Sequence, residues 1–440
     1  MSGGNPGRVA HALIVTPTLP PVPGRDMSGI YRRLGLFVAA LSRIAERLTL
    51  VHFGATDVAA GNPEFEATQS RFWGVPVSTA VVARRTRQET FRGHYLDGVL
   101  SLADQKAFFP FLGADQTTAL RRHLDAKPDL VLACELPAMT AVLRTAARPH
   151  RLFFDITDVL HHAPLRAALT PPFEPGKTLM LAQSPAIFAA ERQGVRAARL
   201  SFIASDIDRR RLRRLGVRRG VVTVPNATEA PAQPPPICLD PTVLYLGNFE
   251  YGPNVEAAER LVRHIMPQIR SLLPQARLLL AGKDSLALPS RRAAPDWVEY
   301  LGFVEDLPAL YARARIVCCP LRNGAGTRVK LVEAAAYGKP MVATRIGAEG
   351  LAFRDGEAIL LRDHDTQIAN ACVSLLRDDA TCARLGAAAR ATMLARYLAE
   401  PVQADIARRL HAALLAPEPG TAGRAWWPAR RRELEVSPGW

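Results

Sequence analysis

The most constraining feature of the sequence is one segment made of four consecutive parts. They are an apolar run, a glycine loop, a helical pattern and a second apolar run. Residues 316–319 are apolar throughout, as expected for a strand buried on both faces of a sheet. Residues 327–336 have a helical pattern that a Gly-Lys-Pro turn ends, and residues 341–344 are apolar again. Strands that alternate with helices across short loops predict an α/β domain with a parallel sheet.

The loop that precedes this helix has the character of a phosphate site. Gly324 and Gly326 let the backbone approach a ligand closely, and Thr327 is placed to cap a helix whose first N–H groups are unpaired. Arg328 and Lys330 add positive charge in the first turn, where the helix dipole disfavours cations. A bound anion would remove this conflict. The alternative is an ordinary glycine turn followed by a surface Arg and Lys.

Glu333 lies about one and a half helical turns beyond Thr327. Its carboxylate could accept two hydrogen bonds from a sugar diol, and the alternative is an exposed glutamate with no ligand. Together with the glycine loop and the two cations, Glu333 predicts a site for a sugar nucleotide.

The same residues resemble the donor-site signature of family 4 glycosyltransferases with the GT-B fold, which transfer sugars from nucleotide sugars with retention of configuration. The matching positions are Gly324, Gly326, Arg328, Lys330, Glu333, Ala334, Gly338 and Pro340. The resemblance implies that Glu333 holds the nucleotide ribose. Many members have a second glutamate that contacts the donor sugar, and its place is taken here by Ala325.

The second half of the chain also carries the rest of the expected donor domain. Apolar runs predict strands at 242–246, 277–281 and 297–301. Asn254 is expected to cap an amphipathic helix that follows the first of them. In the family, the loop at Gly247 and Asn248 borders the donor phosphates, and the backbone near Val304 holds the base.

The first half opens with a predicted strand at 10–16, a Pro/Gly-rich loop, a helix from about 30 to 47 and a strand at 48–52. This order is the start of a Rossmann-like half. In the family the first loop helps to form the acceptor site, and Gly29 is the nearest match to its glycines. An ordinary connecting loop is the alternative.

Two further positions are candidates for the acceptor side. Asp155 and Asp158 follow a predicted strand at 151–154, and open α/β sheets bind ligands at that end of their strands. His161 and His162 come next, and His161 could relay a proton or contact the acceptor. The alternative for the two histidines is a solvated surface pair.

A Pro-rich stretch, residues 227–241, is the clearest linker in the sequence. The resemblance then implies an α/β GT-B fold, with two Rossmann-like doubly wound domains that face each other across a cleft. The predicted parts are an acceptor-side domain (1–226), the linker, a nucleotide-sugar domain (242–396), a C-terminal helix that crosses back to the first domain (397–416) and a basic tail with tryptophans (417–440). The tail suits a membrane interface, and a disordered tail is the alternative.

The net charge of +15 favours anionic partners: nucleotide sugars, acidic membrane lipids or nucleic acid. A GC-rich genome is the alternative cause of the many arginines. Nucleic acid is not expected, because the sequence has neither a nucleic-acid-binding motif nor interleaved aromatics. No apolar run reaches the ~18 residues of a membrane span, and the six cysteines lack paired metal-ligand spacing. We therefore expect a cytoplasmic protein, in peripheral contact with the inner face of the membrane.

The predicted activity is transfer of a sugar from a nucleoside-diphosphate sugar to a glycan, lipid-linked or other hydroxyl acceptor. Charge that builds on the departing diphosphate would be neutralised by the helix N-terminus and by Arg328 and Lys330 as catalytic residues, so no metal or other cofactor is expected. The alternative is a non-catalytic GT-B-like protein that binds a nucleotide sugar or a glycan, for which Ala325 is the main argument. A dinucleotide oxidoreductase is excluded because the loop after Thr16 lacks G-x-G-x-x-G.

Overall fold

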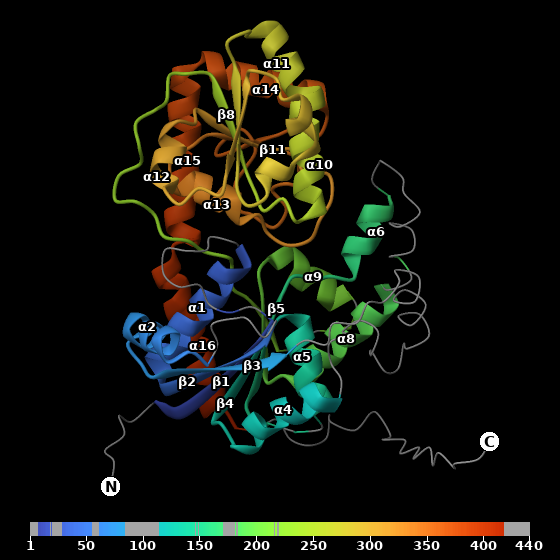
Figure 1. Cartoon of the computed structure of the whole chain (residues 1–440), viewed down its shortest axis with the longest axis vertical. Helices are drawn as coiled ribbons and strands as arrows, with labels where there is room; N and C mark the ends of the chain where they lie inside the picture. The colour runs from blue at the N-terminus through green and yellow to red at the C-terminus, as the bar shows by residue number, and fades with distance from the viewer. Residues whose placement is uncertain are drawn as a thin grey trace, which may run out of the picture.

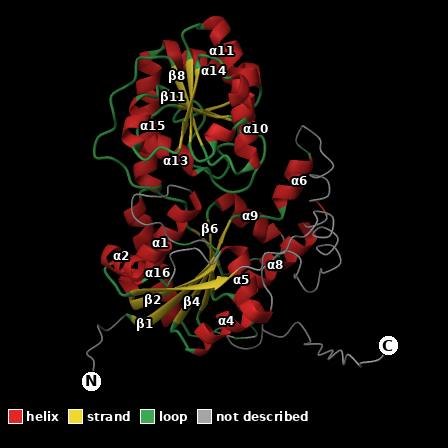
Figure 2. Ribbon diagram, in the orientation of Figure 1, coloured by secondary structure: helices red, strands yellow, loops and turns green. Residues whose placement is uncertain are grey.

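The computed structural model describes most of the chain as two α/β domains (Figure 1). The described residues are 8–17, 19, 29–54, 61–83, 114–145, 147, 149–169, 181, 184–214, 216–217 and 220–417. In each domain a central sheet is covered by helices on both faces (Figure 2). This layered arrangement explains why the strands are continuous apolar runs rather than alternating ones.

The N-terminal domain contains a seven-stranded parallel sheet of order β3-β2-β1-β4-β5-β6-β7. Its strands are β1 (Val9–Thr16), β2 (Ala45–Gly54), β3 (Val77–Ala83), β4 (Leu130–Cys134), β5 (Leu152–Thr157), β6 (Leu200–Ile203) and β7 (Val221–Thr223). Its helices are α1 (Gly29–Ile44), α2 (Pro63–Trp73), α4 (Ala114–Asp125), α5 (Glu135–Arg144), α6 (His162–Ala168), α8 (Ser184–Ala197) and α9 (Asp206–Arg214). Along β1, Ala12 and Ile14 belong to the apolar cluster on one face, and Leu13 and Val15 belong to that on the other.

The end of α1 differs from the prediction. The helix ends at Ile44 rather than near residue 47, and β2 begins at Ala45. Residues 45–47 pair in parallel register with β1, with Ala45 opposite Val9 and Arg47 opposite His11. The local sequence could continue a helix, but pairing with a central strand gives these backbone groups their hydrogen bonds.

The C-terminal domain contains a six-stranded sheet of order β10-β9-β8-β11-β12-β13, again parallel. Its strands are β8 (Thr242–Leu246), β9 (Arg277–Ala281), β10 (Val298–Gly302), β11 (Ile316–Cys319), β12 (Met341–Ala343) and β13 (Leu360–Leu361). Its helices are α10 (Gly252–Arg260), η2 (Leu261–Ile265), α11 (Met266–Leu272), η3 (Ser285–Ala287), η4 (Pro289–Ala293), α12 (Leu307–Ala312), α13 (Val329–Ala336), α14 (Asp365–Arg377) and α15 (Asp379–Arg396). The parallel, doubly wound sheet expected from the sequence is confirmed in this domain.

Asn254 does not cap α10 as predicted. The helix begins at Gly252 with Tyr251 as its N-cap residue, and Pro253 occupies the first turn, where a proline is favoured. The Asn254 side chain instead accepts a hydrogen bond from the Tyr245 hydroxyl (3.0 Å) and donates to the Asn248 carbonyl (2.7 Å). It therefore links the helix to the end of β8.

The last helix, α16 (Ala399–Leu415), lies in the N-terminal domain beside α1 (Figure 1). Its buried side chains Val402, Ile406 and Leu410 join the apolar cluster of that domain. Just before it, the Thr228 N–H donates to the Tyr397 carbonyl (3.0 Å) and the Ala399 N–H donates to the Thr228 carbonyl (3.1 Å). The two passages of chain between the domains are thus hydrogen-bonded side by side. Residues 418–440, most of the predicted basic tail, lie outside the described residues, and no described helix is apolar and long enough to cross a membrane.

Candidate functional site

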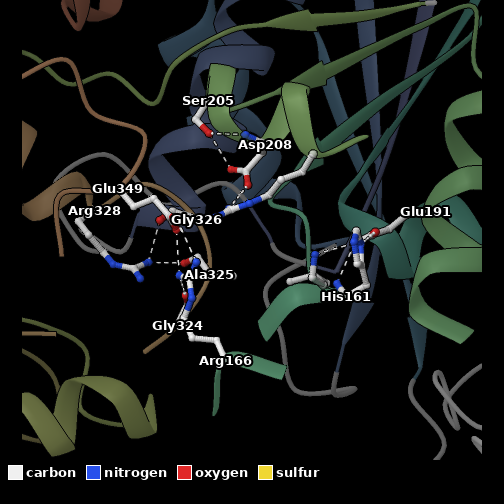
Figure 3. A network of polar contacts seen from close by, with 12 residues as sticks. His161, Arg166, Glu191, Ser205, Asp208, Gly324, Ala325, Gly326, Arg328 and Glu349 are labelled. Atoms are coloured by element: carbon white, nitrogen blue, oxygen red, sulfur yellow. Dashed lines mark hydrogen bonds and ion pairs between the residues drawn. The ribbon is translucent and has the colours of Figure 1, made fainter. Parts of the chain in front are cut away.

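The glycine loop between β11 and α13 faces the N-terminal domain and is in direct contact with it. The Asn226 side chain donates to the Thr327 hydroxyl (2.8 Å), and Arg166 of α6 donates to the Gly324 carbonyl (2.8 Å; Figure 3). The loop follows the carboxyl end of β11, and doubly wound sheets bind ligands at the carboxyl ends of their strands.

The two glycines of this loop are required by both backbone conformation and space. Gly324 has φ 110° and Gly326 has φ 78°, values that side-chain-bearing residues rarely adopt. A Cβ on Gly326 would lie 2.3 Å from both carboxylate oxygens of Asp158, and one on Gly324 would lie 2.8 Å from the Tyr251 hydroxyl. Any larger residue would push the loop away from these neighbours.

The N-terminus of α13 is not capped by Thr327, and that prediction is wrong. The helix begins at Val329, its N-cap residue is Arg328, and no side chain caps it. Thr327 is instead held by Asn226 of the other domain, which the local sequence could not indicate. The uncapped end keeps the positive end of the helix dipole directed at the loop.

Arg328 turns back over its own loop. Its Nη1 donates to the Gly326 carbonyl (2.9 Å) and to the Ala325 carbonyl. Its Nε and Nη2 atoms are buried and have no hydrogen-bond partner, and Arg328 forms no ion pair with the described residues. A buried guanidinium with two unused donors is an arrangement that a bound anion would complete.

Lys330 lies against the end of β8. Its ammonium donates to Asn254 Oδ1 (2.9 Å) and to the Tyr245 hydroxyl (3.2 Å) and lies 4.3 Å from the centre of the Tyr245 ring. Removal from water lowers the pKa of Lys330 to about 8, and Arg328 acts in the same direction. The ammonium lies 3.1 Å from where a Cβ on Gly247 would be, so the structure does bring Gly247 next to Lys330.

Glu333 is buried, which excludes the alternative of an exposed glutamate. It forms an ion pair with Arg32 of α1, in the other domain, and accepts a hydrogen bond from the Tyr311 hydroxyl (3.4 Å). Burial raises the pKa of Glu333, although the Arg32 guanidinium acts in the opposite direction. A ribose held by Glu333 would share the carboxylate with Arg32 or displace it.

The other two residues expected to contact the donor, Asn248 and Val304, follow β8 and β10 of the same domain. The Asn248 side chain is engaged in its own turn, where it accepts from the Glu250 N–H (3.0 Å). Val304 follows β10 and packs on the domain core. Any contact that Val304 makes with a base would come from its backbone, as the resemblance implies.

Asp155, expected on the acceptor side, is part of a buried ion pair. Arg33 Nη2 lies 2.6 Å from Asp155 Oδ1, and Arg33 Nε lies 2.8 Å from Asp155 Oδ2. Both side chains are only 2–3% exposed. Since both carboxylate oxygens are engaged, Asp155 holds α1 against β5 rather than presenting a free group to a ligand.

His161 is not part of a solvated surface pair, because it is buried. Its Nδ1 lies 2.5 Å from Glu191 Oε2, and its ring centre is 4.1 Å from that of His162. Figure 3 shows His161 and Glu191 to one side of the 324–328 loop. Gly29 is the first residue of α1, and most of the loop before it, residues 20–28, lies outside the described residues.

Sequence reasoning missed the residues of the N-terminal domain that hold the loop. Arg166 and Arg211 both bind Glu349, with shortest distances of 2.8 and 2.5 Å. Single arginines in an arginine-rich chain carry no signal in the sequence. Only the spatial arrangement identifies Arg166 as the contact that holds the Gly324 carbonyl, and Arg211 as the residue that shares Glu349 with it.

Three comparisons with known proteins bear on this arrangement. The family described as "Glycosyl transferases group 1" matches residues 240–378, which cover β8 to α14 and the whole loop region. A phosphatidyl-myo-inositol mannosyltransferase of Mycobacterium leprae is 30% identical over 176 residues. The match covers 39% of this chain and 46% of that protein, so the chain spans about half the length of its relative.

The family match places the similarity to group 1 glycosyltransferases in the C-terminal domain. Solved structures resemble the chain over both domains. Sucrose-phosphate synthase from Thermosynechococcus elongatus has a TM-score of 0.66 at 17% identity, with 92% of this chain and all of that chain covered. Anabaena Alr3699/HepE in complex with UDP-glucose has a TM-score of 0.60 at 16% identity, with 91% and 99% covered. The predicted GT-B fold is confirmed by this likeness.

Proposed function

We propose that the protein is a family 4 glycosyltransferase that moves a sugar from a nucleoside-diphosphate sugar to a hydroxyl acceptor, with retention of configuration. The observation that carries the proposal is the pair of cations at the N-terminus of α13, of which Arg328 is buried and Lys330 is half-buried. Arg328 and Lys330 have no carboxylate partner among the described residues, whereas Glu333, on the same helix, is a buried carboxylate. A nucleoside diphosphate supplies both an anion for the cations and a diol for the carboxylate.

The proposed reaction breaks the bond between the anomeric carbon and the diphosphate oxygen, and the bond to the acceptor oxygen forms on the same face. The electron pair of the broken bond goes to the diphosphate oxygen, and the proton of the acceptor hydroxyl passes to the departing diphosphate, which leaves as the nucleoside diphosphate. Arg328, Lys330 and the uncapped end of α13 are fixed before the reaction and meet the charge where it develops. These cations are proposed to act without a metal or another cofactor.

The acceptor is proposed to be a glycan or a lipid-linked hydroxyl. The mannosyltransferase relative is named for a phosphatidyl-myo-inositol lipid, and the net charge of +15 favours peripheral contact with acidic lipids at the inner face of the membrane. A second candidate, a non-catalytic nucleotide-sugar binding protein, is favoured by Ala325, which leaves the loop without a side-chain ligand for a sugar. Turnover of GDP-mannose or UDP-glucose with a hydroxyl acceptor distinguishes the two.

UDP or GDP should stabilise the protein in the presence of EDTA. Because the ligand binds only the folded state, a concentration of 100 times Kd adds about 2.7 kcal/mol to the free energy of unfolding. Thermal melting with and without nucleotide measures this effect, and UMP, which lacks the second phosphate, should stabilise less. Stabilisation that requires Mg²⁺ or Mn²⁺ would show that the cations of the protein are insufficient.

Glu333→Gln should raise KM for the donor roughly tenfold with little change in kcat. The ribose hydroxyls are held equally in the ground and transition states, so their loss affects binding. Replacing a charged acceptor by a neutral one costs about 1–2 kcal/mol. Steady-state kinetics with a nucleotide-sugar donor checks this, with Glu357→Gln as the control because Glu357 is exposed and pairs with Arg354. An unchanged KM would remove Glu333 from the donor site.

A further inference from the structure

Asp158, in the turn after β5, is the carboxylate of the N-terminal domain that lies directly against the glycine loop. Both of its oxygens are 2.3 Å from the position of a Cβ on Gly326, so the carboxylate touches the Gly326 backbone. Its Oδ1 is buried and has no hydrogen-bond partner. The mechanism described above does not use this group.

The neighbouring carboxylates differ from Asp158 because each is fully engaged. Asp155 binds Arg33 (2.6 Å), Asp208 accepts from Ser205 (2.7 Å) and Arg211 (2.7 Å), and Glu349 binds Arg166 (2.8 Å). A buried carboxylate oxygen without a partner costs free energy in the absence of a ligand. A ligand hydroxyl that donates to this oxygen would explain why an unpartnered carboxylate lies against the glycine loop.

The loop itself offers no polar side chain to a sugar, since residues 324–326 are Gly-Ala-Gly. In the proposed function, the ribose lies at Glu333 and the diphosphate at Lys330 and Arg328. The transferred sugar, at the other end of the diphosphate, then lies toward Gly326. Hexose hydroxyls need hydrogen-bond acceptors there, and Asp158 is in place to provide one.

We propose that Asp158 is a ligand of the transferred sugar, whose hydroxyls donate hydrogen bonds to its carboxylate across the domain interface. This inference rests on the proposed function. Both domains then contribute to the donor site. The C-terminal domain holds the nucleotide and the diphosphate, and the N-terminal domain binds the sugar. Asp158 is then a determinant of which donor sugar is accepted.

The charged groups around Asp158 shift its pKa, so binding of the sugar should depend on pH. Burial and Asp208 of α9 raise the pKa of Asp158 to about 6, Asp155 of β5 adds to this, and Arg33 of α1 and Arg328 of the loop oppose it. Asp158 is therefore mostly ionised at pH 7 and becomes protonated as the pH falls through 6. The affinity for the nucleotide sugar should weaken over that range.

The test compares the affinities of UDP with UDP-glucose, and of GDP with GDP-mannose, by titration calorimetry on the full chain. Asp158→Asn, which keeps the shape of the side chain, should weaken binding of the accepted nucleotide sugar on the order of 10-fold to 100-fold. Binding of the matching nucleoside diphosphate should change less than about twofold. Between pH 7 and pH 5 the affinity for the nucleotide sugar should fall more in the unmodified protein than in Asp158→Asn. The two proteins are compared with the nucleotide sugar because the terminal phosphate of UDP or GDP itself titrates at about pH 6.

Two further variants make the result decisive. Asp158→Ser provides a second, smaller replacement with the same expected selective loss, and both variants are checked by thermal melting. Asp206→Asn is the matched control, because Asp206 is exposed on α9 and binds Thr223 and Arg209. An equal loss for nucleotide and nucleotide sugar, or no loss for either, would overturn the role of Asp158 alone. If the unmodified protein binds no nucleotide and no nucleotide sugar, the proposed function falls with it.

Discussion

Replacing Arg328 and Lys330 together by alanine should lower kcat for sugar transfer by at least roughly 10³-fold. Each cation is proposed to meet negative charge that grows on the diphosphate as the sugar departs, and loss of one such donor costs about 10²–10³-fold. Lys330→Ala alone should lower kcat by roughly 10²-fold, because Arg328 partly compensates. Single-turnover and steady-state rates, measured with the accepted nucleotide sugar, give both values.

The pH dependence of the reaction isolates Lys330. Because its pKa is lowered to about 8, Lys330 loses its charge as the pH rises through that value, and kcat/KM should fall above pH 8. Lys330→Arg keeps the charge at high pH, so this fall should disappear in the variant even if its rate at pH 7 is reduced.

The matched control for the double variant is Arg354→Ala with Arg384→Ala. It also removes two positive charges from the C-terminal domain, but both side chains are exposed and contact residues 356–357. A folded Arg328→Ala/Lys330→Ala protein with unchanged kcat would mean that the diphosphate is stabilised elsewhere. The Gly247 loop, which touches Lys330, would then be the next segment to alter.

The second large effect concerns stability. Asp155→Ala should lower the free energy of unfolding of the N-terminal domain by about 3–5 kcal/mol, because it leaves the buried Arg33 guanidinium without its counter-charge. Arg33 also donates to the Val224 carbonyl (3.1 Å) and to Asn226 Oδ1 (3.0 Å), so it joins α1 and β5 to the chain after β7.

Urea denaturation followed by circular dichroism measures this loss, with each domain treated as a separate transition because a two-domain chain need not unfold in one step. Glu400→Ala is the control. Glu400 is 68% exposed and pairs with Arg43 at 3.3 Å, so its removal should cost no more than about 1 kcal/mol. Equal effects of the two substitutions would show that the Arg33–Asp155 pair does not stabilise the domain.

The sequence predicted those elements whose signal is local. Strands β8, β9 and β11 begin and end at the predicted residues, since apolar runs bounded by Pro, Gly or polar residues leave little choice of boundary. Helix starts were less predictable: Thr327 and Asn254 were both expected to be caps. Each forms its hydrogen bonds with residues outside its helix, so the expected caps were replaced by tertiary contacts.

Only the part of the site whose residues lie close together in the sequence was predicted. The glycine loop, Arg328, Lys330 and Glu333 lie within ten residues of each other, so their spacing could be recognised along the chain. The partner of Glu333 is Arg32, 301 residues away, and Asp155 pairs with Arg33, 122 residues away. Which charged groups meet is decided by the packing of whole domains. A sequence pattern within one element carries no information on that choice.

The position of α16 has a consequence for how the protein is made. The apolar cluster of the N-terminal domain is completed by side chains from residues 399–414, which are synthesised after the entire C-terminal domain. Domains generally fold as units from the N-terminus during synthesis. Here the face of α1 that α16 covers stays uncovered until the last helix has emerged from the ribosome. The C-terminal domain can complete its own core earlier, so the order of maturation is the reverse of the order of translation.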